Sequence, residues 1–325
     1  MRTSDLVACE RRGFLARGAG ALGAIWAATE ADRAIASAPY PAEWSPTAYA
    51  HALAFDMASK HTGQRYRIVL GLPHAPAPAE GLPVLWALDG LASFPLMEVE
   101  RARPARVGES AAWRQQVGKE SVGLIVAVGY ASGDPFDINA RARDYTPVVA
   151  GRTGDAFSTE HGGAEAFLRF LVEELRPHLA QHFPMDAQRH TLFGFSYGGL
   201  FTAHTLSTQP QHFQRYWAAS PSLWFGEHHL MKTLSERLRN LHSTSPVRVM
   251  VTVGEDEQYP AQFASPAVQK KLQERTMVDN VLRFAELVRA RELPQWQVQL
   301  ARVPGHDHLD MLFHGARRVL AFAFA

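Results

Sequence analysis

The segment "HTLFGFSYGGLF", residues 190–201, decides the fold of this chain. It begins as an apolar, β-leaning run that ends at Phe195, and it continues with the composition of a helix. Between these parts, Gly194 and Gly198 flank Ser196 in the pattern G-x-S-x-G. The pattern often occurs by chance, so it indicates a nucleophilic serine only where a strand precedes it, a helix follows, and an acid and a histidine come later. The segment itself meets the first two conditions.

Other apolar runs predict the strands that surround this segment. Strands are expected within 65–73, 82–90, 121–130, 190–195, 213–225, 246–254 and 296–303, and helices within 164–183, 197–208, 277–293 and 311–325. The runs at 82–90 and 121–130 are almost continuously apolar, which is typical of strands buried on both faces. Strands that alternate with helices predict an α/β fold with a mostly parallel central sheet and helices on both faces.

Two segments have no clear place in that alternation. Residues 37–60 are expected to be an extension packed on the domain. Residues 131–163 are rich in Gly, Asp, Arg and Thr and are too long for a plain connection. Irregular segments of this length are usually functional lids or disordered, so we expect the second one to border the site.

The N-terminus has the features of an export signal. A paired arginine at 11–12 precedes a weakly apolar run and an A-x-A site that ends at Ala36. This order of motifs predicts a twin-arginine signal over residues 1–36, which the twin-arginine export machinery would recognise. Residues 37–325 would then be a single catalytic domain in the periplasm. The alternative is an amphipathic helix that stays attached.

Composition excludes several classes of protein. Lysine plus arginine (33) nearly equals aspartate plus glutamate (32), so no nucleic-acid partner is expected. Cleavage of the signal would remove Cys9, the only cysteine, and with it any disulfide, thiol nucleophile or cysteine metal site. Beyond the signal, no segment has about 18 consecutive apolar residues, so no membrane anchor is expected. No dinucleotide or haem motif is present, and no cofactor is predicted.

The acid and the histidine that the serine requires both follow it in the sequence. The strand at 246–254 is followed by "EDEQ", in which Glu257 is best placed to orient a histidine and Asp256 is the second choice. The last strand is followed by "PGHDHLDM", in which we expect His308 to be the general base. Serine, acid and histidine in this order are typical of α/β-hydrolases.

The same histidines allow a second interpretation. His306 and His308 could ligate a metal, with a third ligand from Asp307, Asp310 or residues 255–257. A metal site would not explain the turn around the serine, so none is predicted.

Ester cleavage also requires donors for the oxyanion. One should be the backbone N–H of Tyr197, the residue after the nucleophile. The other should come from the loop after "ALDG", and the N–H of Leu91 is the expected donor.

These residues lie in segments that resemble a known family. The segments are "YRIVLGLP", "PVLWALDG", "RARDYTP", "GGAEAFLRFLVEELRP", "FGFSYGGLFTAHTLSTQPQHFQRYWAASPSLWF", "TVGEDEQ", "ERTMVDN" and "VPGHDHLDML". Their order over residues 50–325 resembles that in the bacterial esterases that include the siderophore (enterobactin and bacillibactin) esterases. The likeness to the esterase D and mycolyltransferase groups is more distant. The most specific part is "SYGGL…SPSLW".

The resemblance implies an α/β-hydrolase fold and ester cleavage by a serine–histidine pair. It matches Ser196 to the nucleophile, His308 to the histidine, Leu91 to the oxyanion position and, less closely, Glu257 to an acidic position. The family's "G-x-D-H-G-S" ending reads "GHDHLD" here, which leaves the local loop shape open.

The resemblance also suggests substrate-binding residues. "RARDYTP" matches a segment near the mouth of the active site, so Arg141 and Arg143 could meet an anionic substrate, with Arg143 the chosen candidate. An ion pair with Asp144 or a neighbour is an equally good interpretation for either arginine. Trp224 and residues 131–163 could line a pocket that accepts aromatic groups.

The sequence therefore predicts a periplasmic serine carboxylesterase that acts on a small-molecule ester, with trilactone siderophores as candidate substrates. Two alternatives remain open at this point. One is an acyltransferase on the same fold, and the other is a hydrolase-like protein that binds a ligand without cleaving it.

Overall fold

The computed structural model describes residues 41, 44–46, 49, 51–101, 122–241, 245–260, 265–293 and 295–325. Residues Pro41–Ala325 form one compact unit. The expected export signal, residues 1–36, lies outside the described residues.

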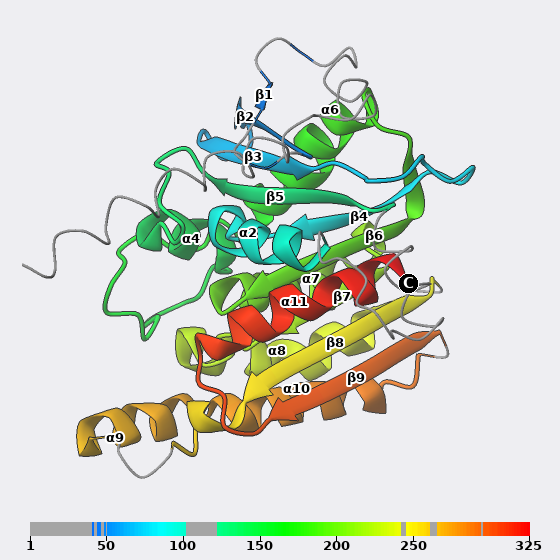
Figure 1. Cartoon of the computed structure of the whole chain (residues 1–325). Coiled ribbons are helices and arrows are strands. Elements are labelled where there is room, and N and C mark those ends of the chain that lie inside the picture. Colours follow the sequence, from blue (N-terminus) through cyan, green and yellow to red (C-terminus); the bar gives the residue numbers. More distant parts are fainter. Residues whose placement is uncertain are drawn as a thin grey trace, which may run out of the picture. The chain divides into compact units, whose positions relative to one another are not determined.

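The described residues build a nine-stranded sheet (Figure 1). From one edge to the other its strands are β1 (Ser45–Pro46), β2 (Ala52–Ala58), β3 (Arg65–Gly71), β5 (Leu124–Tyr130), β4 (Leu82–Ala87), β6 (Met185–Phe195), β7 (Arg215–Ala219), β8 (Val247–Gly254) and β9 (Trp296–Val303). All neighbours from β5 to β9 pair in parallel, and the pairs from β1 through β3 to β5 are antiparallel. The predicted mostly parallel sheet is confirmed.

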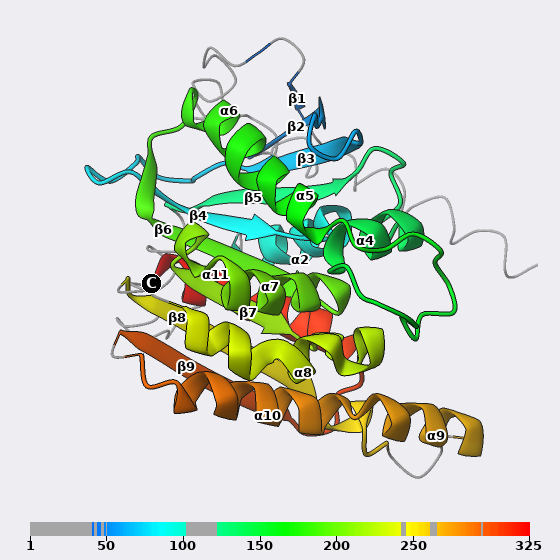
Figure 2. The ribbon, with the colours of Figure 1, turned by 180° about the vertical axis from the view of Figure 1, so that it is seen from behind.

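Helices cover both faces of this sheet. One face carries α2 (Gly90–Arg101) and α11 (Asp310–Phe324), which pack on each other (Figure 1). The other face carries the remaining packed helices, as the view from behind shows (Figure 2): α4 (Ile138–Tyr145), α5 (Ala164–Arg169), α6 (Arg176–Ala180), α7 (Tyr197–Thr208), α8 (Phe225–Asn240) and α10 (Met277–Ala290). A π-helical turn, Phe170–Leu175, joins α5 to α6, so the predicted helix at 164–183 is continuous to Ala180.

One helix departs from this arrangement. Helix α9 (Pro266–Arg275) has no buried residue and projects from the body beyond the N-terminal end of α10 (Figures 1 and 2). Core packing therefore does not account for its position.

The apolar runs that predicted strands occupy the centre of the sheet. Every residue of β4 and β5 is buried, because helices lie on both sides of these strands. Side chains from β4, β5 and β6 on one face meet α2 and α11 in one apolar cluster that includes Leu85, Phe94, Phe193 and Leu320. The central strands are held rigidly, and their carboxyl ends are fixed relative to one another.

The structure adds elements that the sequence did not predict. Residues 37–60 contribute β2, which pairs with β3 along its whole length. Residues 131–163 include α4, whose N-terminus is capped by the Asp137 carboxylate accepting from the N–H of Ala140. Helices α2, α8 and α9 were also missed, and strand β6 begins at Met185 rather than at 190.

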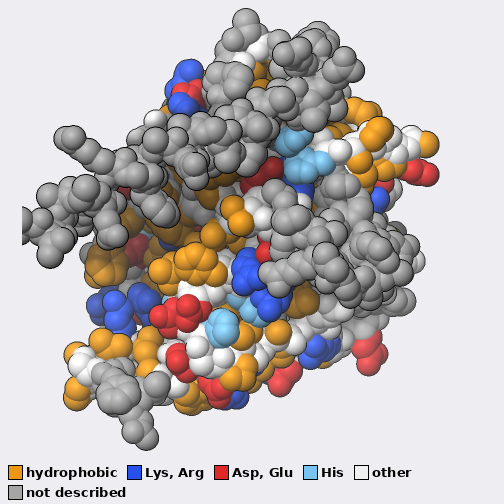
Figure 3. All heavy atoms as spheres, viewed as in Figure 1, with side chains coloured by type: hydrophobic (Ala, Val, Ile, Leu, Met, Phe, Trp, Pro, Cys, Tyr) orange, Lys and Arg blue, Asp and Glu red, His pale blue; other side chains and the backbone are white. Residues whose placement is uncertain are grey.

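Side chains of both charges are mixed on one face of the described part of the molecule. Hydrophobic, acidic and basic side chains lie side by side on the face that carries α2 and α11 (Figure 3). Within the described parts of the chain, no helix has the length and apolar character needed to cross a membrane.

Candidate active site

The serine turn has a strained backbone. Ser196 lies between the end of β6 and the start of α7 with φ 59° and ψ −115°. A non-glycine residue rarely adopts a positive φ, and such strain persists only where the surroundings enforce it. Here the N–H of Ser196 donates to the carbonyl of Ala219 at 2.9 Å, and the Ser196 carbonyl accepts from Ser222 and Leu200. The predicted strand–turn–helix is confirmed.

Gly194 is required by this turn. A β-carbon added there would lie 2.0 Å from the carbonyl oxygen of Gly198, which no side chain could tolerate. The end of β6 and the first turn of α7 therefore approach each other with only hydrogen at position 194.

The predicted nucleophile, base and acid are close together. The Ser196 Oγ lies 2.9 Å from His308 Nε2, and His308 Nδ1 lies 2.5 Å from Glu257 Oε2. One imidazole thus bridges a hydroxyl and a carboxylate that are far apart in the sequence. This is the geometry in which a neutral imidazole can take the serine proton and a carboxylate can hold the resulting imidazolium.

Glu257 is distinguished from its acidic neighbours by burial and partners. Its carboxylate is buried, and Oε1 accepts from the Ser220 hydroxyl at 2.5 Å and from the Gly254 N–H at 2.8 Å. Glu255 instead pairs with Arg302 near the surface. Asp256 borders a hollow next to His308, and the carboxylate that meets His308 Nδ1 is that of Glu257.

The two histidines of "GHDH" have different surroundings. The His308 ring lies against Phe195, with centroids 4.7 Å apart. His306 Nδ1 lies 2.9 Å from the Pro304 carbonyl oxygen, and its ring is 5.8 Å from that of His314. In the described residues no group of three histidine, cysteine or carboxylate side chains could hold a metal ion.

The expected oxyanion donors lie at two helix N-termini. Tyr197 is the first residue of α7, and Leu91 is the second residue of α2. The first N–H groups of a helix have no partner within it. The preceding strands, β4 and β6, are parallel neighbours, so both helices begin at the same edge of the sheet. Both helix dipoles favour negative charge there.

A buried ion pair supports the loop before Leu91. Asp89 has φ 49° and a buried carboxylate, to which Arg141 donates twice, from Nε at 3.0 Å and from Nη2 at 2.9 Å. Arg141 Nη2 also lies 3.3 Å from the Phe195 carbonyl oxygen. Burial alone would lower the pKa of Arg141, but the Asp89 carboxylate more than offsets this, and the pKa lies above its usual value. One guanidinium therefore joins the oxyanion loop to the end of the nucleophile strand.

Arg143 forms the ion pair that the sequence analysis named as the alternative to substrate binding. Its guanidinium pairs with Asp144, with Nε 2.7 Å from Oδ1 and Nη2 3.0 Å from Oδ2. The hollow at Ser196 is lined by Arg141 instead. Residues two apart on a helix point in nearly opposite directions, so Arg141 and Arg143 in "RARDY" cannot share one face of α4.

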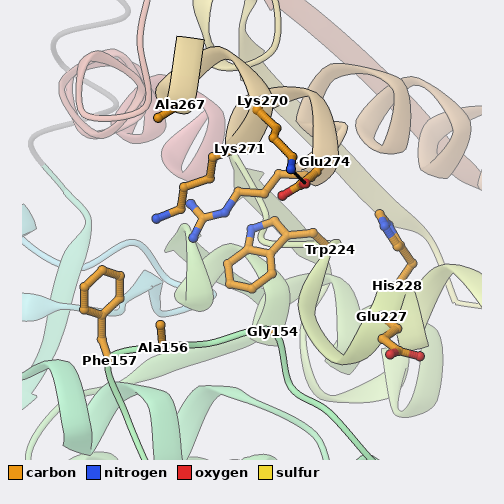
Figure 4. Close-up of a pocket in the computed structure, with 11 residues that line it drawn as sticks. Gly154, Ala156, Phe157, Trp224, Glu227, His228, Ala267, Lys270, Lys271 and Glu274 are labelled. Carbon is orange, nitrogen blue, oxygen red and sulfur yellow. Dashed lines mark ion pairs between the residues drawn. The ribbon is translucent and has the colours of Figure 1, made fainter. Parts of the chain in front are cut away.

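Three adjoining hollows form a cleft around the serine. The central one has a volume of about 280 Å³ and is bordered by Ser196, His308, Arg141, Ser222 and Trp224. A second, of about 550 Å³, lies on the far side of Trp224 (Figure 4), and a third, of about 500 Å³, lies beyond His308. Trp224 therefore lines the cleft as the sequence suggested.

Sequence reasoning missed several residues of this site. Ser220 contacts the acid, and Ser222 Oγ lies 3.4 Å from Ser196 Oγ. Both belong to "SPSLW", the segment already known to be specific. Asp89 stands in the quoted "ALDG", but nothing near it in sequence indicated its partner. Arg275 borders all three hollows, and it comes from a helix that the sequence did not predict.

Comparison with known proteins agrees with this geometry. A family model described as "Putative esterase" matches residues 59–309. The ferri-bacillibactin esterase BesA of Bacillus subtilis is 29% identical over 277 residues, which are 82% of this chain and 87% of that protein. The siderophore triacetylfusarinine C esterase of Aspergillus fumigatus is 30% identical over 256 residues, 75% of this chain and 82% of that one.

Solved structures are similar over most of the chain. The siderophore hydrolase EstA from Aspergillus nidulans superposes with a TM-score of 0.71 at 26% identity, covering 86% of this chain and 98% of that one. The BES protein from Bacillus cereus gives a TM-score of 0.68 at 26% identity, with the same coverage of both chains. The predicted α/β-hydrolase fold is confirmed.

Proposed function

Because the chain belongs to the esterase family that matches residues 59–309 and is a hydrolase of ester bonds, we propose that it is a periplasmic serine esterase that cleaves siderophore esters through an acyl-enzyme. The observation that carries the mechanism is the chain of contacts from Ser196 Oγ through His308 to Glu257. The named activities of the relatives support the substrate class.

The first half-reaction forms the acyl-enzyme. Ser196 Oγ attacks the ester carbonyl carbon while His308 Nε2 takes the hydroxyl proton. The carbonyl oxygen gains negative charge and accepts hydrogen bonds from the N–H groups of Tyr197 and Leu91. The tetrahedral intermediate then breaks its bond to the alcohol oxygen, which leaves with the proton from His308.

The second half-reaction releases the acid. A water molecule attacks the acyl carbon, His308 Nε2 takes its proton, and the bond to Ser196 Oγ breaks as the proton returns to that oxygen. Glu257 holds the His308 Nδ1–H throughout and stabilises the imidazolium in both halves. No cofactor takes part in this scheme.

A labelling experiment tests the nucleophile. The full chain without its signal is incubated with a fluorophosphonate probe, and adducts are located by mass spectrometry. We expect one adduct on Ser196 and none in Ser196→Ala, together with loss of ester turnover by several orders of magnitude. A folded protein that is not labelled would contradict the mechanism and favour the ligand-binding alternative.

Turnover of iron-loaded and iron-free trilactone siderophores then tests the substrate class. Release of the linear hydrolysis products, abolished in Ser196→Ala, is the expected result. Acyl transfer to an added alcohol in preference to water would contradict hydrolysis and support the acyltransferase alternative.

The export proposal is tested separately in cells. Replacing Arg11 and Arg12 by lysine should retain the protein in the cytoplasm, since the paired arginines are the recognised feature. Unchanged periplasmic recovery after fractionation would contradict export by this route.

A further inference from the structure

Two cations of α9 border the cleft and form no ion pair with a described carboxylate, although the charge of Asp155 acts on Arg275. The Arg275 guanidinium lies over the Trp224 ring, 4.2 Å from its centroid, and the Lys271 ammonium lies 5.3 Å from the centroid of Phe157. Burial lowers the pKa of Arg275, which reflects a charge partly withdrawn from water. A guanidinium in this situation is available to an anion that enters the cleft.

Two carboxylates near Trp224 are paired with lysines. Figure 4 shows Trp224 between Phe157 on one side and His228 on the other, with Lys270, Lys271 and Glu274 of α9 nearby. Glu274 pairs with Lys270 at 3.9 Å and Glu227 pairs with Lys232 at 3.9 Å, whereas His161 Nε2, 3.2 Å from Asp155 Oδ2, compensates that carboxylate only when the imidazole is protonated. The hollow at Trp224 is lined by Lys270, Lys271 and Arg275 against Glu227 and Glu274, so its lining has an excess of positive charge.

The opposite hollow, beyond His308, has a different character. It is bordered by the carboxylates of Asp256, Glu257 and Asp307 and by apolar side chains, and Arg275 borders it as well. Carboxylates outnumber the one arginine there, so an anionic group would be disfavoured on that side and attracted on the side of Trp224. The charges thus define one preferred orientation of a substrate across Ser196.

The local structure holds Arg275 in place. Trp224 precedes a turn in which Gly226, Glu227 and His228 all have positive φ, and the N–H of Gly226 donates to the Thr153 carbonyl at 2.8 Å. Arg275 is the last residue of α9, a helix that no core contact explains. The position of α9 is explained if the helix serves to place Lys271 and Arg275 at the cleft.

We propose that Arg275, stacked on Trp224, is a specificity-determining residue that binds a negatively charged group of the substrate on the Trp224 side of Ser196. This inference rests on the proposed serine esterase function and adds to it a substrate class, esters that carry an anionic group near the scissile bond. Lys271 contributes a second, more exposed charge.

The test compares two esters that differ in charge. 4-Nitrophenyl butyrate is neutral, and the 4-nitrophenyl monoester of succinic acid carries a carboxylate on its acyl part. The measured quantity is the ratio of kcat/KM for the anionic ester to that for the neutral ester. Arg275→Gln should lower this ratio about tenfold, as expected for loss of one charge-assisted hydrogen bond. Arg275→Lys, which keeps the positive charge, should retain part of the preference for the anionic ester.

Arg283→Gln is the matched control, because Arg283 is an exposed arginine of α10 that pairs with Glu286 outside the cleft. It should leave the ratio at the wild-type value, and added salt should lower the ratio in wild type but not in Arg275→Gln. An unchanged ratio in Arg275→Gln, or an equal fall in Arg283→Gln, would overturn the assignment of Arg275. Neutral-ester turnover that persists in Ser196→Ala would instead overturn the proposed function.

Discussion

The cleft has two sides that treat charge in opposite ways. On the inner side, formed by the strand ends, Asp89 is paired with Arg141, and Glu257 accepts three hydrogen bonds including that of His308. On the outer wall, formed by Phe157, Trp224 and the α9 residues Lys271 and Arg275, the cations rest on aromatic rings. The comparison teaches that a charge paired with an opposite charge inside the protein holds the residues of the site in position. A charge that forms no such ion pair can instead bind a charged group of the ligand.

The two arginines of the cleft illustrate this difference. Arg141 has a side chain that is only 12% exposed, and it donates to the Asp89 carboxylate through both Nε and Nη2. Arg275 borders the same central hollow, where it lies over the Trp224 ring and is influenced by the charge of Asp155 without forming an ion pair with a described carboxylate. We therefore expect changes on the inner side to affect kcat or folding, and changes on the outer wall to affect substrate preference.

The largest effect is expected at the base. His308→Asn removes the group that takes the serine proton and should lower kcat by about 10⁵- to 10⁶-fold, because the members of such a triad act as a unit. Steady-state kinetics with a neutral ester measures it. His306→Asn is the control, since that ring faces the Pro304 carbonyl, and its kcat should stay within about twofold of wild type. Similar losses in both variants would contradict the distinction between the histidines.

A smaller loss is expected at the acid. Glu257→Gln keeps the shape of the side chain but removes the charge that stabilises the imidazolium, and kcat should fall about 10³- to 10⁴-fold. Glu255→Gln, which only breaks a pair with Arg302, should have little effect on kcat. A greater loss in Glu255→Gln than in Glu257→Gln would contradict the assignment of the acid.

Loss of the ion pair between Arg141 and Asp89 should lower mainly the stability of the fold. Arg141→Met leaves the Asp89 carboxylate buried without its partner, which should lower the free energy of unfolding by about 3–5 kcal/mol. Denaturant unfolding measures this change. The double variant Arg141→Met with Asp89→Asn removes the uncompensated charge and should recover part of the loss. If the double variant is no more stable than Arg141→Met, the loss of stability does not come from an unpaired buried charge at Asp89.

The smallest effect is expected on the outer wall. Trp224→Leu removes the ring beneath Arg275 and should raise KM for an anionic ester about two- to fivefold, in line with the strength of an exposed cation–π contact, with kcat nearly unchanged. Tyr259→Leu is the matched control, because Arg302 lies 5.5 Å from that ring outside the cleft. An equal rise in KM for both variants would show that the effect does not come from the cleft.

Local patterns were sufficient for the parts of this protein where neighbouring residues decide the structure. The apolar run "LPVLWA" followed by Asp-Gly is typical of a buried strand in an α/β protein, and Ser196 between Gly194 and Gly198, with a strand before it and a helix after it, predicts the tight turn that the structure contains. The order of serine, acid and histidine followed from the order of the strands, because parallel strands place their carboxyl ends at one edge. Glu257 and His308 were therefore predictable before their contact was known.

Contacts between distant segments were decided only by the tertiary structure. Arg141 and Arg143 are equivalent in the sequence, but the direction of each side chain on α4 joins one to Asp89 and the other to Asp144. Helix α9 has no apolar stripe from which it could be predicted. The proposed role of Arg275 in substrate binding depends on its contact with Trp224, which lies 51 positions earlier in the sequence. A sequence shows which residues can ionise or stack, whereas the free energy of a charge depends on what surrounds it after folding.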